Sequence, residues 1–349
     1  MKNAKYGIIT MVIAVLATAA ALYYVISANA ALFQKTVSSI TLGHLALVLL
    51  SSAGAYMCMG IALHELLKAL DYRLGYFETM GIAFVSTTVN YVVSSLGAGG
   101  FALRAHLLQK RNVPFCTVLV SSALLMMLIY FVLALLVLQG FLVLLATSGS
   151  GSAHFAEGMV GVILLLAVCF TFAVVFFRHD LRSIWMRKGF RVLNRVFYFF
   201  SIKQIPDEDY VKFAEQVEEG ITLIHAKKHK LTTVLLAVCG DWICTIGVLY
   251  LAFYGMGVHL GVGELVVGFA FGMVATLIPI LPGGVGALEV AMTAAYAGFG
   301  VPWATALTAV LIFRVAYYIL PGLLSVLIYW GLHLGASVGA QSEGSCSTN

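Results

Sequence analysis

Charged side chains are scarce in this chain of 349 residues. Lys, Arg, Asp and Glu together make up 10% of it, and apolar residues make up 61%, whereas a soluble domain carries about 25% charged residues. Proline is also rare, with six residues, so little interrupts long helices. Several apolar runs reach the ~20 residues that cross a bilayer core. We therefore expect an all-α integral membrane protein, built as a polytopic helical bundle.

Other missing patterns argue against several kinds of site. The six cysteines show no Cys-x-x-Cys spacing, so free thiols are expected rather than a zinc or dithiol site. An intramembrane zinc protease needs His-Glu-x-x-His, but Lys68 stands where the second histidine should follow His64 and Glu65. His44, His64 and His333 lie near span ends, which disfavours bis-histidine haem binding. We expect no metal and no cofactor.

Long apolar stretches define the predicted membrane spans. Six continuous stretches lie at 6–27, 43–67, 116–138, 158–177, 231–256 and 303–331. Two further apolar regions, 79–111 and 264–299, are each interrupted near the middle by glycine or proline. The first stretch ends near Ala28-Asn29-Ala30, which resembles a signal-peptide cleavage site. Its apolar run is long for a signal peptide, so a retained helix is favoured.

The chain repeats itself after about 186 positions. Four pairs of matching segments occur in the same order in both halves. They are 48–50 with 234–236, 74–78 with 260–264, 97–104 with 282–289, and 113–115 with 301–303. In membrane proteins, segments interrupted by Gly or Pro at corresponding positions of two halves indicate a transporter's binding site.

The distribution of cations predicts the orientation, because short cytoplasmic loops collect Lys and Arg. The loop at 178–230 carries eleven Lys and Arg residues, whereas a hairpin topology leaves Lys35 alone outside. A single crossing at 79–111 would instead place Lys110, Arg111 and that basic loop outside. We therefore predict that both interrupted regions are re-entrant helical hairpins and that the N- and C-termini are cytoplasmic. The spans 43–67 and 231–256 then run in opposite directions, so the repeat is inverted.

The predicted organisation has five parts. They are an N-terminal transmembrane helix and outer loop (1–42), a first repeat (43–157), a transmembrane helix with a basic cytoplasmic amphipathic loop (158–230), a second repeat (231–334) and a disordered tail (335–349). Within the loop, the segment 181–200 is basic and aromatic, which suits binding to anionic lipids of the inner leaflet. The sequence pI of about 8.8 reflects this cytoplasmic bias, so no nucleic-acid partner is expected.

The candidate site lies where the interrupted regions resume as helices. Irregular backbone inside a membrane is tolerated where protein or a water-filled cavity covers it. A helix that resumes there exposes free N–H groups, which favour an anion. Buried charges at such depth mark a pathway or site by default. The candidate residues are Arg104, Arg314, Glu289, Asp241, Gly99, Gly100, Pro282, Gly283, Gly284 and Asn90. Two structural alternatives stay open: the glycines allow close helix packing, and Glu289 with Arg314 forms an ion pair that only holds helices together.

Several of these motifs resemble a known family. Pro282-Gly283-Gly284-Val285-Gly286-x-x-Glu289, then Gly300-Val301-Pro302 and Arg314, resemble the signature of the lysylphosphatidylglycerol synthase transmembrane family, a flippase-like, UPF0104-type group. The glycine-rich turn before Arg104 is similar to that family's N-terminal motif. Here Phe101-Ala102-Leu103 replaces its usual Pro and Gly-Glu pair. The resemblance implies lipid translocation in a bacterial or archaeal-type plasma (inner) membrane.

We therefore expect a flippase-like lipid translocase rather than an enzyme. It would move an anionic or aminoacylated phospholipid, or a polyprenyl-phosphate-type lipid, between leaflets through a midplane cavity. Only 335–349 follows the last span, which leaves no room for a soluble aminoacyl-lipid synthase domain. The alternatives are a secondary transporter of a small anionic solute and an integral-membrane lipid-phosphate transferase, for which two isolated acids are a poor metal site. Homo-oligomer formation remains open.

Overall fold

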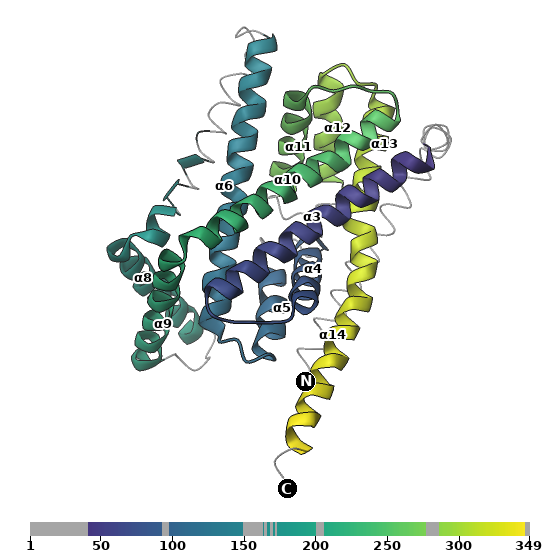
Figure 1. The fold of residues 1–349 in the computed structure, drawn as a ribbon. Coiled ribbons are helices and arrows are strands. Elements are labelled where there is room, and N and C mark those ends of the chain that lie inside the picture. Colours follow the sequence, from purple (N-terminus) through teal and green to yellow (C-terminus); the bar gives the residue numbers. More distant parts are fainter. Residues whose placement is uncertain are drawn as a thin grey trace.

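The computed structural model describes a bundle of helices. The described residues are 41–92, 98–148, 163, 166–167, 170–171, 173–199, 206–276 and 286–345. Their helices are α3 (Leu42–Ala69), α4 (Tyr76–Val92), α5 (Ala98–Gln109), α6 (Phe115–Ser148), α8 (His179–Phe199), α9 (Asp207–Ala226), α10 (Lys228–Gly255), α11 (Val262–Thr276), α12 (Ala287–Gly298), α13 (Trp303–Arg314), the π-helix η2 (Val315–Ile319) and α14 (Leu320–Ser345) (Figure 1). No strand occurs in these residues.

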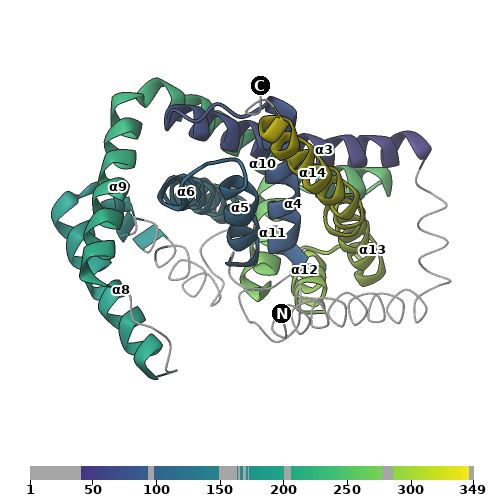
Figure 2. The same ribbon diagram turned by 90° about the horizontal axis from the view of Figure 1, so that it is seen from below.

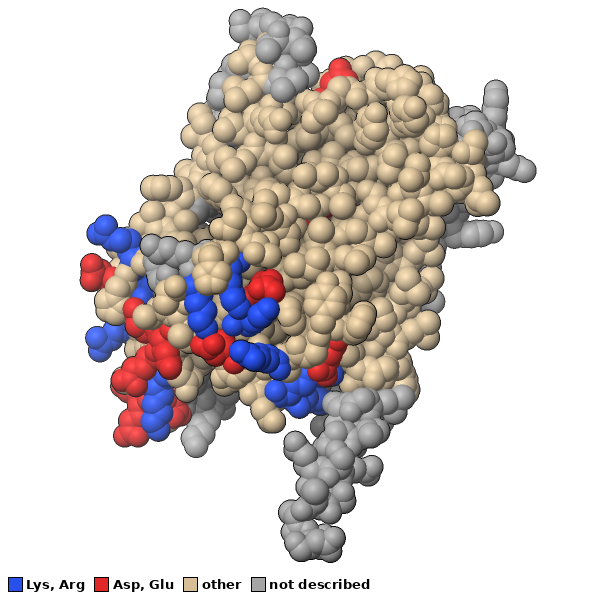
Figure 3. Space-filling model, in the orientation of Figure 1, with Lys and Arg blue, Asp and Glu red and all other residues tan. Residues whose placement is uncertain are grey.

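Four helical stretches of the described residues are long and apolar enough to cross a membrane. They are Leu42–Ala69, Phe115–Leu142, His229–Gly255 and Trp303–Leu332, and each coincides to within a few residues with a span predicted from the sequence. The predicted span 6–27 and much of 158–177 lie outside the described residues. Charged side chains gather at the lower end of the molecule over α8 and α9, and most of the remaining visible face is uncharged (Figure 3). The protein is thus an all-α integral membrane protein.

Helices α3 and α10 pack against each other in antiparallel fashion along one side of the bundle (Figures 1 and 2). A Cβ at Gly54 would lie 3.1 Å from Cys244 Sγ, and one at Gly240 would lie 2.9 Å from Cys58 Sγ. The two helices bury matching positions, offset by about 186 residues. These are Val48, Ser52, Ala55, Tyr56, Met59, Ala62, Leu63, Leu66 and Leu67 in α3, and Val234, Val238, Asp241, Trp242, Thr245, Val248, Leu249, Ala252 and Phe253 in α10. The buried face of α3 therefore corresponds, position by position, to the buried face of α10.

The turns that end these helices also match. Asp71 after α3 and Gly257 after α10 both adopt a left-handed conformation, with φ of 67° and 74°. The next residue in each half donates its N–H back across the turn, Tyr72 to the Leu67 carbonyl and Val258 to the Phe253 carbonyl. Glycine takes this conformation without steric cost, and Asp is among the few other residues that visit it. The second half thus has the lower-strain residue at this turn.

The two interrupted regions each form a pair of short helices whose outer ends meet. Arg111, just after α5, pairs with Glu78 in the first turn of α4. In the second pair, the Tyr296 hydroxyl near the end of α12 donates to the Leu265 carbonyl near the start of α11, at 2.9 Å. Helices α5 and α12 have 12 residues each, about 18 Å at 1.5 Å per residue, against a bilayer core of about 30 Å. In Figure 1 the α4–α5 pair lies toward the lower end and the α11–α12 pair toward the upper end.

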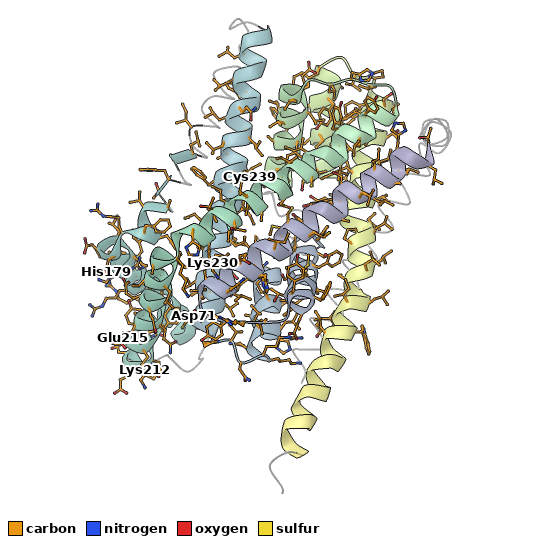
Figure 4. All side chains as sticks on the ribbon, in the orientation of Figure 1. Asp71, His179, Lys212, Glu215, Lys230 and Cys239 are labelled. Carbon is orange, nitrogen blue, oxygen red and sulfur yellow. The ribbon has the colours of Figure 1, made fainter. Side chains whose placement is uncertain are left out.

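Helices α8 and α9 lie at the lower end beside α6 (Figures 1 and 2). The face of α9 that carries Val217, Ile221 and Ile224 is buried. The Lys227 ammonium donates to Asp71 Oδ1 at 2.6 Å, which joins the α9–α10 junction to the end of α3. This hydrogen bond lowers the pKa of the Asp71 carboxyl. Figure 4 places Asp71, Lys230 and the α8–α9 side chains at this one end of the molecule.

Helix α14 runs further than the sequence suggests. It continues to Ser345, well into the segment 335–349 that we predicted to be disordered. Pro321 is the last proline of the chain, so no later residue blocks helix propagation by removing an N–H donor. The described part of this tail is therefore helical.

Candidate functional site

Glu289 and Arg314 form a buried ion pair between α12 and α13. Arg314 Nε donates to Glu289 Oε1 at 2.6 Å, and Nη2 lies 3.4 Å from Oε2. The side chains are only 8% and 4% exposed. Glu289 also accepts the Gly286 N–H at 2.7 Å, which holds the carboxylate at the positive end of α12. The ion pair proposed from the sequence is thus present.

Arg314 directly precedes an irregular turn in the last span. Residues Val315–Ile319 form a π-helix, and Pro321 has no N–H to offer the Tyr317 carbonyl. The Ser52 hydroxyl donates to the Ala316 carbonyl at 2.7 Å, and the Tyr56 hydroxyl donates to the Tyr317 carbonyl at 2.9 Å. Since unpaired carbonyls are costly in a membrane, α3 side chains stabilise this turn. π-Helical turns of this kind often occur at functional sites.

Arg104 is the buried cation of the first half. It is 5% exposed and donates to Ser86 Oγ at 3.2 Å and Ser122 Oγ at 3.4 Å. It pairs with no carboxylate among the residues that the structure describes. In the sequence repeat it stands where the second half has Glu289. The first half therefore holds a guanidinium among neutral hydroxyls.

The start of α5 packs tightly on α4 beside Arg104. The Gly100 N–H donates to Asn90 Oδ1 at 2.7 Å. A Cβ on Gly100 would lie 2.2 Å from the Ser86 carbonyl oxygen, so only glycine fits here. Gly99 precedes it on the same first turn. These contacts position the helix start that carries Arg104.

Asp241 lies in a separate polar and aromatic cluster around η2. It is 4% exposed, and its Oδ1 has no hydrogen-bond partner among the described residues. It lies close enough to Tyr56, Tyr91 and Tyr317 to interact electrostatically with each of them. The Thr245 hydroxyl donates to the Tyr317 hydroxyl at 3.1 Å, and the latter lies 3.0 Å from the Tyr91 hydroxyl. A chain of hydroxyls thus connects α10, η2 and α4.

Aromatic rings connect this cluster to the Arg314 ion pair. The Arg314 guanidinium carbon lies 4.6 Å from the Tyr318 ring centroid, an attractive cation–π contact. The ring of Tyr318 is 5.0 Å from that of Tyr91, which is the neighbour of Asn90 in α4. Arg314 and α4 therefore both contact the Tyr318 ring of η2.

The structure places most of the predicted site residues in these three groups. The first group is Arg314 with Glu289. The second is Arg104 with Asn90, Gly99 and Gly100, and the third is Asp241 with its tyrosines. Pro282, Gly283 and Gly284 lie outside the described residues.

Sequence reasoning missed the polar side chains that surround the charges. The missed residues are Ser52, Tyr56, Ser86, Ser122, Thr245, Tyr317 and Tyr318. One signal was present in the chain, because two tyrosines and a proline closely follow Arg314 within an apolar span.

Comparisons with known proteins identify the fold family. The family model of the lysylphosphatidylglycerol synthase TM region matches residues 11–325. A phosphatidylglycerol lysyltransferase of Staphylococcus aureus (strain MRSA252) is 29% identical over 110 residues, which are 32% of this chain and 13% of that protein. A UPF0104 membrane protein of Methanothermobacter thermautotrophicus is 25% identical over 162 residues, 44% of this chain and 48% of that protein. The match thus spans less than half the length of either relative. Because the family model covers most of the sequence, this chain belongs to the lysylphosphatidylglycerol synthase transmembrane family.

Proposed function

We propose that this protein moves a lipid with an anionic or aminoacylated headgroup between the two leaflets. A phospholipid and a polyprenyl-phosphate-type lipid both carry the phosphate that this mechanism needs. The buried Arg104 is the observation that carries the proposal. Placing a charge in a membrane is costly unless an opposite charge or strong hydrogen bonds compensate it, and the described partners of Arg104 are two neutral serines. A lipid phosphate would supply the missing negative charge through charge-assisted hydrogen bonds.

The matching halves support an alternating mechanism. We infer an inverted repeat in which α3–α5 and α10–α12 are related by a pseudo-two-fold axis between α3 and α10. The reciprocal contacts of Gly54 with Cys244 and Gly240 with Cys58 are what such an axis requires. The short helix pairs then reach toward the middle of the membrane from opposite leaflets as re-entrant hairpins. In related architectures, substrate sites lie at the midplane between the repeats.

The two cations differ in how they would hold a headgroup. Glu289 neutralises Arg314, whereas no described acid neutralises Arg104. A phosphate bound at Arg104 could therefore approach Arg314 only by competing with Glu289. We propose that Arg104 forms the primary phosphate contact and that Arg314, Glu289 and Asp241 limit its affinity, so that the lipid can leave.

The described surface also supports contact with an anionic leaflet. On α8, the apolar side chains of Ile184, Trp185 and Val192 are exposed, and the Lys188 ammonium lies 5.4 Å from the Trp185 ring centroid. Aromatic and basic side chains together suit a helix at headgroup level. We propose that α8 lies on the cytoplasmic leaflet of a plasma membrane, which would place the N- and C-termini inside.

Transport of fluorescent lipids in proteoliposomes tests the proposal. Purified protein should accelerate the exchange of a phosphatidylglycerol analogue between leaflets relative to protein-free vesicles. Exchange of a zwitterionic phosphatidylcholine analogue should increase less. Uptake of inorganic phosphate or a short-chain organic anion, without lipid exchange, would instead favour a secondary transporter of small solutes. Covalent change of the lipid by the purified protein would favour a transferase.

A further inference from the structure

Asp241 is a buried acid whose counterpart in the other half is uncharged. Its position in α3 is occupied by Ala55, which is 0% exposed. The two sites share the same burial, yet one holds a methyl group and the other a carboxyl. A buried acid is costly, so its presence in only one half points to a function of that half.

Among the residues that the structure describes, no positive group lies beside this carboxyl. The titratable side chains around it are Tyr56 and Cys58 from α3, Tyr91 from α4, Cys244 from α10 and Tyr317 from η2. All five are neutral in their ordinary state at neutral pH. Asp241 forms no ion pair with a residue that the structure describes, and its Oδ1 has no hydrogen-bond partner there. An isolated buried carboxyl in such surroundings avoids the cost of its charge by binding a proton.

The hydroxyls near this carboxyl join several helices of the proposed mechanism to one another. The chain from Thr245 through Tyr317 to Tyr91 reaches α4, whose Asn90 holds the start of α5. Tyr317 belongs to the π-helix that follows Arg314. A negative charge on Asp241 would therefore act on the residues that join both hairpins, whereas the protonated form would leave them in the described arrangement.

We propose that Asp241 is the proton-binding site that couples lipid translocation to a proton gradient. One proton binds to the carboxylate from one side of the membrane and leaves toward the other, and no other bond is made or broken. This coupling role rests on the proposed translocase function, but proton binding itself does not.

Infrared titration of the protein in lipid tests proton binding without any transport assay. The chain has five aspartates, and the other four, Asp71, Asp180, Asp207 and Asp209, are exposed. Aspartate isotopically labelled at its side-chain carboxyl should give one protonated carboxyl band at neutral pH, which is absent from Asp241→Asn and unchanged in Asp71→Asn. Labelled wild-type protein in which every aspartate is ionised at neutral pH would overturn the proposal, even if Asp241→Asn did not fold.

Vesicles with an imposed pH gradient test the coupling. Lipid exchange by wild-type protein should depend on the direction of the gradient and should be accompanied by proton movement, reported by a trapped pH dye. Asp241→Asn should lose the gradient dependence and the dye signal, and Asp241→Glu should retain both. Gradient-independent exchange by wild-type protein would overturn the coupling while leaving the translocase function intact. Absence of lipid exchange at any pH would instead remove the translocase function, and the infrared result would then stand alone.

Discussion

The two halves of this protein match in helices α3 and α10 but differ in their buried charges. Helices α3 and α10 bury equivalent residues and end in equivalent left-handed turns. Yet Ala55 in one half corresponds to Asp241 in the other, and Arg104 corresponds to Glu289. The buried positions of α3 and α10 thus correspond between the halves, whereas the charged residues do not. These two helices therefore match in packing, whereas the charges near them differ between the halves.

The halves also differ in where glycine permits close packing. In the α4–α5 pair the close-packed glycine lies on α5, at Gly100. In the α11–α12 pair the close-packed glycines lie on α11, at Gly268 and Gly272, where a Cβ would come within 2.2 Å of Tyr296 and Met292. Both helix pairs therefore pack closely, but the glycine that permits it lies on the second helix of one pair and on the first helix of the other.

Breaking the second-half ion pair should have the largest effect on stability. Removing one partner of a buried pair costs about 3–5 kcal/mol, so Glu289→Gln or Arg314→Gln alone should strongly lower the unfolding temperature in detergent. The double variant should recover part of the loss, because no unpaired buried charge remains. The partly exposed pair Glu65–Lys68, with 3.6 Å between its charged atoms, is the control and should change stability by about 1 kcal/mol at most. Additive losses in the double-mutant cycle would contradict an interaction between Glu289 and Arg314.

Alanine at the close-packed glycines should have the next largest effect. Gly100→Ala would drive a methyl group into the Ser86 carbonyl, which is backbone and cannot move away. Overpacking of this kind costs about 1–3 kcal/mol. Gly272→Ala should cost less, because the Met292 side chain can change rotamer. Gly331→Ala is the matched control, since nothing lies within 4 Å of its added Cβ. Equal unfolding temperatures for Gly100→Ala and Gly331→Ala would show that the α4–α5 contact is looser than described.

Reciprocal substitutions at the α3–α10 contact test the pseudo-two-fold relation. Gly54→Ala and Gly240→Ala should destabilise by similar amounts, about 1 kcal/mol each, because each meets a cysteine sulfur across the axis. Cys244→Ala should relieve the first variant and Cys58→Ala the second. Relief by the wrong cysteine, or by neither, in thermal unfolding of the double variants would argue against the symmetric contact.

Exchanging residues at the left-handed turns should have the smallest effect. Asn112 has φ of 59° and its counterpart Gly300 has φ of 87°. Since glycine adopts such angles without steric cost, Asn112→Gly should leave stability unchanged or raise it slightly. Gly300→Ala should lower stability by about 1 kcal/mol, because the left-handed region is costly for alanine. A destabilising Asn112→Gly would indicate that the Asn112 side chain has a role beyond the turn, and unfolding curves of both variants measure it.

The sequence predicted the four described membrane-spanning helices and the Glu289–Arg314 pair, because both follow from simple rules. A run of apolar residues gives a span, and two opposite charges at similar depth favour pairing. It could not predict that Ser86 and Ser122 would surround Arg104, because which faces of α4, α5 and α6 meet depends on tertiary packing. The π-helix at Val315–Ile319 was also missed, since its freed carbonyls are satisfied by Ser52 and Tyr56, more than 250 positions earlier in the chain.

Lipid exchange by Arg104→Ala tests the central claim most directly, since this residue distinguishes the first half from the second. Losing charge-assisted hydrogen bonds worth about 1.5–3 kcal/mol should slow exchange of an anionic lipid analogue roughly 10- to 100-fold, with the protein still folded. Arg104→Lys should retain part of the rate, and Lys212→Ala on the exposed face of α9 should match wild type. Wild-type exchange by a folded Arg104→Ala protein would contradict an anion site at Arg104.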